Sequence, residues 1–333
     1  MRTIARRNAE DRLALFRNAA ARLGMSAAIA EKDFWVCWLL DHLFHRCPWK
    51  DAFVFKGGTS LSKGFDLIKR FSEDIDLILD WRVLGYGPDE PWIERSNTKQ
   101  DLFNAEANER AASFLSAEFL PKLRNDLSAE LGTPAILRID PDDPQTVKFS
   151  YPRTSADPSI LQEIRMEIGP LAAWTPSAPR RIVPYAATVY PSLFETPETI
   201  VPTVLPERSF WEKATILHRE AMRAESGAVP ARYSRHYYDL WCMAEAGVDA
   251  RALAQPDLLA RVVRFKEKFY RCPWARYDLA ERPSGLRLVP KPVHAAALTD
   301  DYIHMRDMIF GTIPDFGIVL ARLEQLQSEW AKR

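Results

Sequence analysis

Two acidic residues interrupt an apolar stretch, at Asp74 and Asp76 in the segment FSEDIDLIL (71–79). The segment is predicted as a strand, in which side chains two residues apart face the same way, so both carboxylates share one face. Two neighbouring carboxylates repel each other unless a cation lies between them. Mg²⁺ or Mn²⁺ would supply that cation, because both prefer oxygen ligands. The alternative interpretation is a pair of solvated acids on an edge strand.

A pair of glycines lies upstream of these acids. An apolar strand runs into Gly57 and Gly58, and the spacing predicts a helix over 60–70 after them. Glycines let the backbone approach an anion, and the first N–H groups of a helix can bind it. Thr59 or Ser60 could cap the helix or donate to a phosphate oxygen. The pattern is not a Walker A loop, and a tight turn is the alternative; the neighbouring acids favour a phosphate and metal site.

A third carboxylate would complete a two-metal site. The segment QEIRMEIG (162–169) alternates like a strand, with Glu163, Arg165 and Glu167 on one face. Glu167 is the preferred candidate, because it stands near the strand end, before Gly169. The alternative is an ordinary amphipathic strand in which Arg165 pairs with its acidic neighbours.

The elements that must position these residues form an α/β part followed by a helical part. A proline-dense segment over 184–206 separates the two, and the pattern from 207 onward is mostly helical. We therefore predict an α/β domain over 1–206 and an α-helical domain over 207–333. The predicted helices lie at 8–24, 27–46, 60–70, 101–128, 209–225, 234–247, 257–270 and 316–331, and the predicted strands at 52–55, 75–81, 146–151 and 161–169, the last two joined by a hairpin over 152–159.

The composition excludes several classes of protein. The chain has 333 residues, 47% hydrophobic and 27% charged, as expected of one large or two ordinary globular domains. Lys and Arg number 45, as do Asp and Glu, so the formal net charge is zero and any nucleic-acid site must be a local patch. We see no membrane span, no secretory signal and no zinc spacing among the four cysteines. We expect a cytoplasmic protein with free, mostly buried thiols.

One stretch, over 261–276, is locally basic. It contains six Lys or Arg residues and one acid, Glu267, so its charge is 6 − 1 = +5. Four aromatic residues are interleaved with them, which would allow the stretch to hold an RNA backbone and stack unpaired bases. The alternative places the aromatic side chains in the core and the charges in water. The aromatic residues are Phe265, Phe269, Tyr270 and Trp274.

The residues around the glycine pair carry a family resemblance. The segment FKGGTSLSKGFDLIKRFSEDIDLIL (55–79) resembles the signature of the AbiEii/AbiGii toxins, which are DNA polymerase beta-type nucleotidyltransferases of abortive-infection and toxin–antitoxin systems. Three further segments resemble family motifs in the expected order. They are IAEKDFWVCWLL (29–40), ERSFWEKATILHRE (207–220) and RYSRHYYDLWCM (232–243).

The resemblance implies a role for each matching residue. It implies a polymerase-beta-type domain with a mixed sheet, then a helical domain. Asp74 and Asp76 would bind metal, and Glu167 stands where a third carboxylate is expected. Lys213 would reach the triphosphate, and Asp239 would be the acid of the last motif; without the resemblance they read as a solvated lysine and a partner of Arg235. The implied nucleotide-binding residues are Gly57, Gly58, Thr59, Ser60, Lys63, Lys213 and Arg235.

The sequence thus predicts a metal-dependent nucleotidyltransferase toxin that moves an NMP from an NTP to an acceptor hydroxyl, with Mg²⁺ or Mn²⁺ as cofactor. The resemblance implies an RNA acceptor, the 3′ end of tRNA, and a cognate antitoxin as partner; no membrane is involved. One alternative is a catalytically inactive nucleotide-sensing or partner-binding module on the same fold. Another uses the carboxylates for phosphodiester hydrolysis.

Overall fold

The computed structural model of the chain describes residues 1–155, 157, 160–173 and 175–332. These residues form two compact units. The sheet unit comprises Met1–Gly64 and Ser72–Thr203, and the helical unit comprises Phe65–Phe71 and Val204–Arg333. The chain therefore leaves the sheet unit after Gly64 and returns to it at Ser72. The boundary predicted at residue 206 concerns independently folding domains and stays a prediction.

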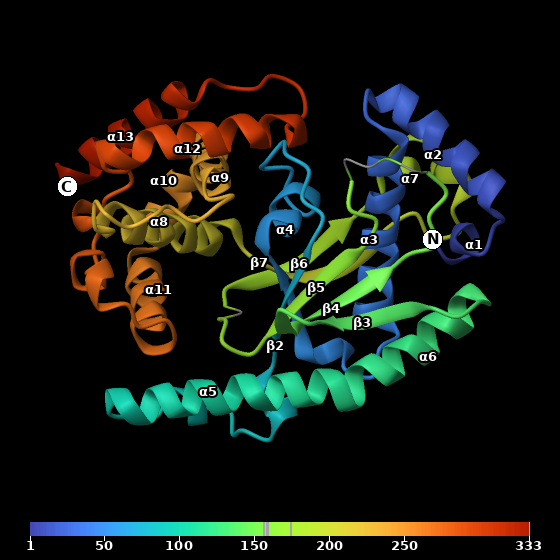
Figure 1. Cartoon of the computed structure of the whole chain (residues 1–333), viewed down its shortest axis with the longest axis horizontal. Helices are drawn as coiled ribbons and strands as arrows, with labels where there is room; N and C mark the ends of the chain where they lie inside the picture. The colour runs from blue at the N-terminus through green and yellow to red at the C-terminus, as the bar shows by residue number, and fades with distance from the viewer. Residues whose placement is uncertain (156, 158–159, 174, 333) are drawn as a thin grey trace. The chain divides into compact units, whose positions relative to one another are not determined.

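A mixed sheet of seven strands forms the centre of the sheet unit in the described part of the chain, in the order β3-β4-β5-β2-β1-β7-β6 (Figure 1). β2 pairs antiparallel with β1 and parallel with β5, and β1 pairs parallel with β7. β3, β4 and β5 pair antiparallel in succession. The predicted α/β class with a mixed sheet is confirmed. The strands are β1 (Phe53–Lys56), β2 (Ile75–Leu79), β3 (Ile136–Asp140), β4 (Asp143–Ser150), β5 (Ile164–Gly169), β6 (Ser177–Ile182) and β7 (Thr199–Val204).

The predicted strands correspond to β1, β2, β4 and β5, whereas β3, β6 and β7 were missed. β6 and β7 contain Pro179 and Pro202, and proline argues against a strand because it has no N–H to donate. The hairpin predicted over 152–159 includes positions 156, 158 and 159, which lie outside the described residues.

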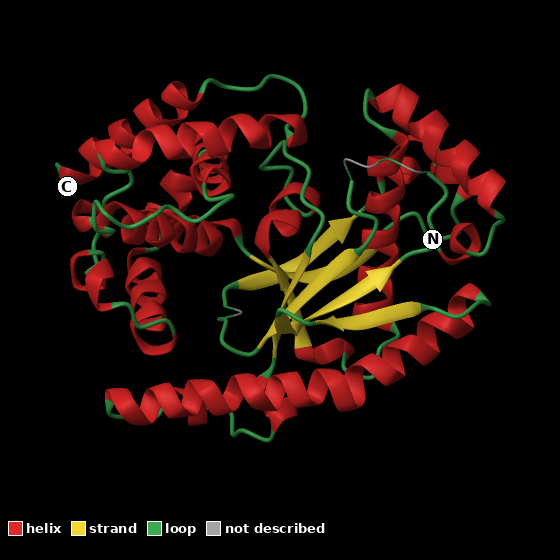
Figure 2. Ribbon diagram, in the orientation of Figure 1, coloured by secondary structure: helices red, strands yellow, loops and turns green. Residues whose placement is uncertain are grey.

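α3 (Ala27–His45) is buried on all sides through its middle. Residues 34–40 are each 2% exposed or less, as expected of a helix that is apolar all round. Trp35 and Trp38 contact Phe149 of β4, with ring centroids 6.4 and 6.0 Å apart. A π-helical turn joins α5 and α6 into one long helix (Figure 2). The other helices of this unit are α1 (Arg2–Ala5), α2 (Ala9–Leu23), α4 (Gly57–Lys63), α5 (Asn97–Phe114), α6 (Leu120–Leu131) and α7 (Tyr185–Val189).

The helix predicted over 60–70 is wrong in its bounds, because α4 spans Gly57–Lys63. Asp66 has a φ of 53°, a left-handed conformation that does not continue an α-helix. The segment that follows instead forms backbone hydrogen bonds with residues 308–310. The apolar spacing that indicated a helix reflects the burial of Ile68, which is 2% exposed and belongs to the helical unit.

The helical unit has an aromatic core. The ring of Trp330 lies 5.4 Å from that of Trp211 and 6.0 Å from that of Phe210, between centroids. Several helices begin at a proline, whose missing N–H is not needed in the first turn. The predicted helices correspond to α8, α9, α11 and α13, and α10 and α12 were missed. The helices are α8 (Pro206–Met222), α9 (Ser234–Glu245), α10 (Val248–Leu253), α11 (Pro256–Phe269), α12 (Pro292–Met305) and α13 (Phe316–Ala331).

The cysteines are free thiols, as predicted. Cys37, Cys47 and Cys242 are buried, and Cys272 is half-buried. Burial raises the pKa of the Cys47 and Cys242 thiols to about 11, so both are protonated at neutral pH and unreactive. None of the helices in the described ranges is long and apolar enough to cross a membrane.

Candidate active site

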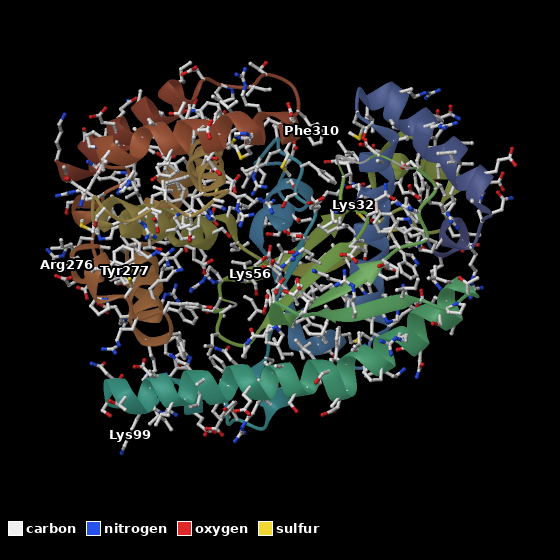
Figure 3. The ribbon with its side chains drawn as sticks, viewed as in Figure 1. Lys32, Lys56, Lys99, Arg276, Tyr277 and Phe310 are labelled. Atoms are coloured by element: carbon white, nitrogen blue, oxygen red, sulfur yellow. The ribbon has the colours of Figure 1, made fainter. Side chains whose placement is uncertain are left out.

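The acids predicted to bind metal lie in a row across neighbouring strands of the sheet unit. Asp76 of β2 is in register with Glu167 of β5 on one side and with Lys56 of β1 on the other. Side chains in register on neighbouring strands share a face. Asp74 directly precedes β2, and it lies near enough to Arg165 (3.9 Å) and to Glu167 to raise the pKa of Glu167. The structure therefore brings the three predicted carboxylates together. Figure 3 labels Lys56, at the end of β1, where the row begins.

The pKa of Glu167 responds to its position in the row. Burial first, and then repulsion from Asp76 and Asp74, raises the pKa of Glu167 to about 7. Arg165 is one nearby cation, and its guanidinium is shared among several acids. It donates to Oδ2 of Asp140 at 2.9 Å and lies 3.6 Å from Oε1 of Glu167 and 3.9 Å from Oδ1 of Asp74. Asp140 also pairs with Lys148 at 2.7 Å, and Lys56 lies in register with Asp76, so several cations share the charge of these acids.

The donor set suits a hard divalent cation. It consists of carboxylate oxygens, which Mg²⁺ and Mn²⁺ prefer. In the part of the chain that the structure describes, no three acidic, histidine or cysteine side chains converge closely enough to enclose an ion as they stand. The assignment of Asp74, Asp76 and Glu167 as metal ligands therefore stays a prediction.

The glycine turn packs directly against one of these acids. Gly57 has a φ of 80°, and a Cβ added to it would lie 1.8 Å from Oδ2 of Asp76. Only glycine fits such a position, both for its conformation and for the space. The position of Asp76 therefore requires a glycine at position 57.

The two hydroxyl residues after the glycines stabilise the turn. The Thr59 hydroxyl donates to the carbonyl oxygen of Asp74 at 2.5 Å and lies 3.0 Å from the Ser72 hydroxyl. The Ser60 hydroxyl donates to the carbonyl oxygen of Gly57 at 2.8 Å. Both side chains are fully buried. Their predicted contact with a phosphate stays a prediction, as does that of Gly58.

Lys63 has a partner inside the sheet unit. Its Nζ forms a 2.6 Å ion pair with Oδ1 of Asp33, in the first half of α3. The same Nζ lies 3.8 Å from the centroid of the Tyr185 ring, a cation–π distance. The predicted contact between Lys63 and a nucleotide stays a prediction.

Asp239 is the centre of an ion-pair cluster within the helical unit. Nε and Nη2 of Arg70 donate to its two oxygens at 2.7 and 2.8 Å, and Nζ of Lys213 donates to Oδ2 at 2.7 Å. Burial alone would raise the pKa of Asp239, but these two cations outweigh it and hold the pKa well below its ordinary value. Asp239 is therefore a charged, fully buried carboxylate.

Lys213 shares the Asp239 carboxylate with Arg70. Burial lowers the pKa of Lys213, and the nearby charges of Arg70 and Arg235 lower it further against the attraction of Asp239. Arg235 and Arg70 also line a cavity of about 100 Å³ within the helical unit, together with Arg232. The cluster thus carries more positive than negative charge.

Comparison with known proteins decides the family. The model of the nucleotidyl transferase AbiEii toxin family, of type IV toxin–antitoxin systems, matches residues 38–328. The chain belongs to the AbiEii family. It is therefore a nucleotidyltransferase and the toxin of a type IV toxin–antitoxin system, which implies an NTP substrate and a cognate antitoxin. The predicted resemblance is confirmed.

Solved structures and curated proteins provide two further comparisons. The AbiEii chain is similar to the solved structure of MenT4, nucleotidyltransferase toxin Rv2826c from Mycobacterium tuberculosis H37Rv. The TM-score is 0.48 and the identity 17%, over 96% of this chain and 98% of that chain. None of the curated proteins matches this chain.

The basic stretch of this AbiEii chain divides between core and surface. Phe265 and Phe269 are each 5% exposed, so they are core residues, as the alternative interpretation predicted. Tyr270 and Trp274 are 48% and 44% exposed. The basic residues Arg261, Arg264, Arg271 and Arg276 are also exposed. His236 packs edge-on against Tyr233, with 5.1 Å between ring centroids.

Sequence reasoning missed two charged residues beside the assigned groups. Arg70 stands four positions before Asp74, and nothing in that spacing connects it with Asp239. Lys56 ends the strand before the glycines, and strand pairing alone places it beside Asp76. Both lie inside the quoted segment 55–79, so their position in that segment was the only available signal.

Proposed function

We propose that this nucleotidyltransferase is metal-dependent and moves an NMP from an NTP to an acceptor hydroxyl, releasing pyrophosphate. The observation that carries the proposal is the row of acids, in which Asp76 and Glu167 are in register and Asp74 directly precedes β2. Their mutual repulsion favours binding of a divalent cation, because a cation removes it. The cation would be Mg²⁺ or Mn²⁺.

The residues of the chain would supply positioning and charge rather than covalent chemistry. A bound divalent cation would activate the attacking hydroxyl and shield the leaving pyrophosphate. Gly57 and Gly58 let the backbone approach the phosphates, and Thr59 and Ser60 keep that turn in shape through their hydrogen bonds.

We assign Lys213 to the triphosphate, because an ammonium group is a compact charge suited to phosphate. Asp239 orients Lys213 through their 2.7 Å ion pair. Arg235, which lines the neighbouring cavity, is assigned as a second cation for the nucleotide.

We propose RNA as the acceptor, in particular the single-stranded 3′ end of tRNA, as the family resemblance implies. The supporting feature is the exposed part of the basic stretch, where Arg264 and Arg271 accompany Tyr270 and Trp274. Exposed cations and rings of this kind bind unpaired nucleotides. A tRNA with a blocked 3′ end could not be aminoacylated, which would arrest growth and limit phage infection.

The direct test is incubation with total RNA, Mg²⁺ and each labelled NTP in turn, followed by sequencing of RNA 3′ ends and measurement of pyrophosphate. We expect added nucleotides on tRNA. Label on protein alone would reject the RNA acceptor, and shortened RNA without pyrophosphate would indicate hydrolysis. Neither pyrophosphate nor altered RNA with any NTP would indicate the inactive nucleotide-sensing module.

The RNA surface is tested by Arg264→Ala, Lys268→Ala and Arg271→Ala. Each should weaken RNA binding with little dependence on sequence and reduce the slope of affinity against salt by about one. NTP affinity should not change, because these residues lie outside the glycine turn and the acids. Arg17→Ala, an exposed arginine of α2, is the matched control. Equal losses in the control, or none in the three variants, would reject this surface.

A further inference from the structure

Three consecutive charged side chains are buried in the first half of α3. Glu31, Lys32 and Asp33 are 1%, 1% and 4% exposed. A buried charge is unfavourable unless the protein supplies a partner. Successive residues of an α-helix point about 100° apart, so the three side chains reach three different segments. The function proposed above assigns none of them a role.

Lys32 connects the segments that lead into the two acidic strands; Figure 3 labels it on α3. Its Nζ donates to Oε2 of Glu73 and to the carbonyl oxygen of Leu161, each at 2.5 Å. Glu73 directly precedes Asp74, and Leu161 lies shortly before β5, the strand that carries Glu167. One buried ammonium group therefore fixes the approach to both strands.

Asp33 fixes the far end of the glycine-turn helix. Its Oδ1 pairs with Nζ of Lys63, the last residue of α4, at 2.6 Å, and its Oδ2 accepts the backbone N–H of Tyr185 at 2.6 Å. The first residue of α4 is Gly57, which packs against Asp76. The helix is thus held at one end by α3 and at the other by the acidic strand.

We propose that Lys32 and Asp33 are positioning residues of the nucleotidyl-transfer site. Lys32 sets the relative position of the acidic strands, and Asp33 sets the glycine turn through Lys63 and α4. The inference rests on the proposed function, because it takes the acids as metal ligands and the turn as the phosphate site. Groups that orient metal ligands from behind typically change metal affinity or activity 10–100-fold.

Lys32→Met tests the first half. Mn²⁺ affinity, measured by EPR without nucleotide, should fall about tenfold or more, while KM for NTP changes far less. The double variant Lys32→Met/Glu73→Gln removes both charges of this ion pair, so it can be measured if the single variant folds poorly. Mn²⁺ affinity should fall no further in the double variant than in the single variant. Unchanged Mn²⁺ affinity in either folded variant overturns the role of Lys32.

Asp33→Asn and Lys63→Met test whether Asp33 positions the glycine turn through Lys63. If Asp33 acts by holding Lys63, each variant raises KM for NTP by a similar factor, about tenfold, and the double variant is no worse than either. If Lys63 contacts the nucleotide directly, Lys63→Met raises KM and Asp33→Asn does not, which overturns the role of Asp33. The double variant also removes both buried charges together, which favours folding.

Glu31→Gln is the matched control. Its carboxylate accepts four hydrogen bonds, of 2.7 to 3.0 Å, from the N–H and hydroxyl groups of Thr154 and Ser155. It should lower the melting temperature but leave Mn²⁺ affinity and KM unchanged. Equal losses in this control would show general disruption of α3 and overturn the inference.

The two proposals fail in different ways. A wild-type protein that transfers nucleotides, with Lys32 and Asp33 variants that behave like it, overturns this inference alone. A wild-type protein that transfers no NMP from any NTP rejects the proposed function. In that case Mn²⁺ affinity still decides the role of Lys32, because it is measured without turnover.

Discussion

The sheet unit and the helical unit each hold an assigned carboxylate, and the two are shifted in opposite directions. Glu167 is 43% exposed at its side chain, yet burial and two neighbouring acids raise its pKa to about 7. Asp239 is fully buried, yet Arg70 and Lys213 hold its pKa below the ordinary value. At Glu167 burial and the neighbouring acids act in the same direction, whereas at Asp239 the two neighbouring cations outweigh burial.

The two units surround their carboxylates with different charges. The helical unit supplies its own cations, so Asp239 is ionised and its partners are fixed by it. The sheet unit instead gathers Asp74, Asp76 and Glu167, whose repulsion contributes to the raised pKa of Glu167. A site of the second kind gains most from a bound divalent cation. The four predictions that follow test this contrast.

The largest effect is expected from Asp239→Asn. It leaves Arg70 and Lys213 buried without a counter-charge, so unfolding in urea at pH 7 should show a loss of about 3–5 kcal/mol. Because the folded pKa is lowered, the stability from Asp239 is present above the ordinary value of 3.8 and is lost as pH falls through the folded pKa. The loss should therefore shrink in strong acid. Asp300→Asn, an exposed acid of the same unit, is the control. A loss below about 1 kcal/mol would contradict a buried, ionised Asp239.

Asp76→Asn should separate activity from stability. Removing one carboxylate from the row should slow transfer by at least about 100-fold in Mg²⁺. The free energy of unfolding should stay unchanged or rise slightly, because repulsion among the acids is relieved. Glu163→Gln, on the same face of the strand segment but paired with Arg138, should keep the wild-type rate. Near-full activity of Asp76→Asn would show that the metal-site assignment is wrong.

Lys213→Met tests whether the ion-pair cluster around Asp239 contributes to nucleotide binding. NTP affinity measured by calorimetry should fall about tenfold, because a charge for the phosphates is lost. The fold should survive, since Asp239 keeps Arg70 as a bidentate partner. Lys213→Arg should restore affinity only in part, because a planar fork does not replace a point charge. Equal NTP affinity together with an unchanged transfer rate would remove Lys213 from the site.

Glu167→Gln should have the smallest effect of the four variants. It should raise the stability of the protein, whereas Asp239→Asn should lower it. The folded pKa of Glu167, about 7, lies above its ordinary 4.5, so the folded protein binds more protons between these values and loses stability as pH rises through them. Without metal at pH 8, the variant should be more stable than wild type by on the order of 1 kcal/mol, a value reduced for solvent screening of this exposed group. The difference should vanish below pH 4.5 and shrink when Mg²⁺ is added. A difference that does not depend on pH would contradict the shift.

The candidate site could be predicted from the sequence where short-range patterns determine the structure. Alternation placed Asp74 and Asp76 on one face, and it placed Glu167 on its strand. Helical periodicity failed at 60–70, because the helix ends at Lys63 and the chain at 69–71 forms backbone hydrogen bonds with residues 308–310 instead. Strands with internal prolines were missed for the same reason: their pairing partners, not their own pattern, make them strands.

The sequence by itself determined the mixed α/β class, the acids on one strand face and membership of the AbiEii family. These follow from short-range patterns and from motifs that lie together in the chain. Only the tertiary structure decided that Arg70 pairs with Asp239, 169 positions away, that Lys32 joins the approaches to two strands, and that Gly57 packs on Asp76. Charge interactions and burial act through space, so the pKa of a carboxylate depends on neighbours whose order in the chain carries no trace of their contact.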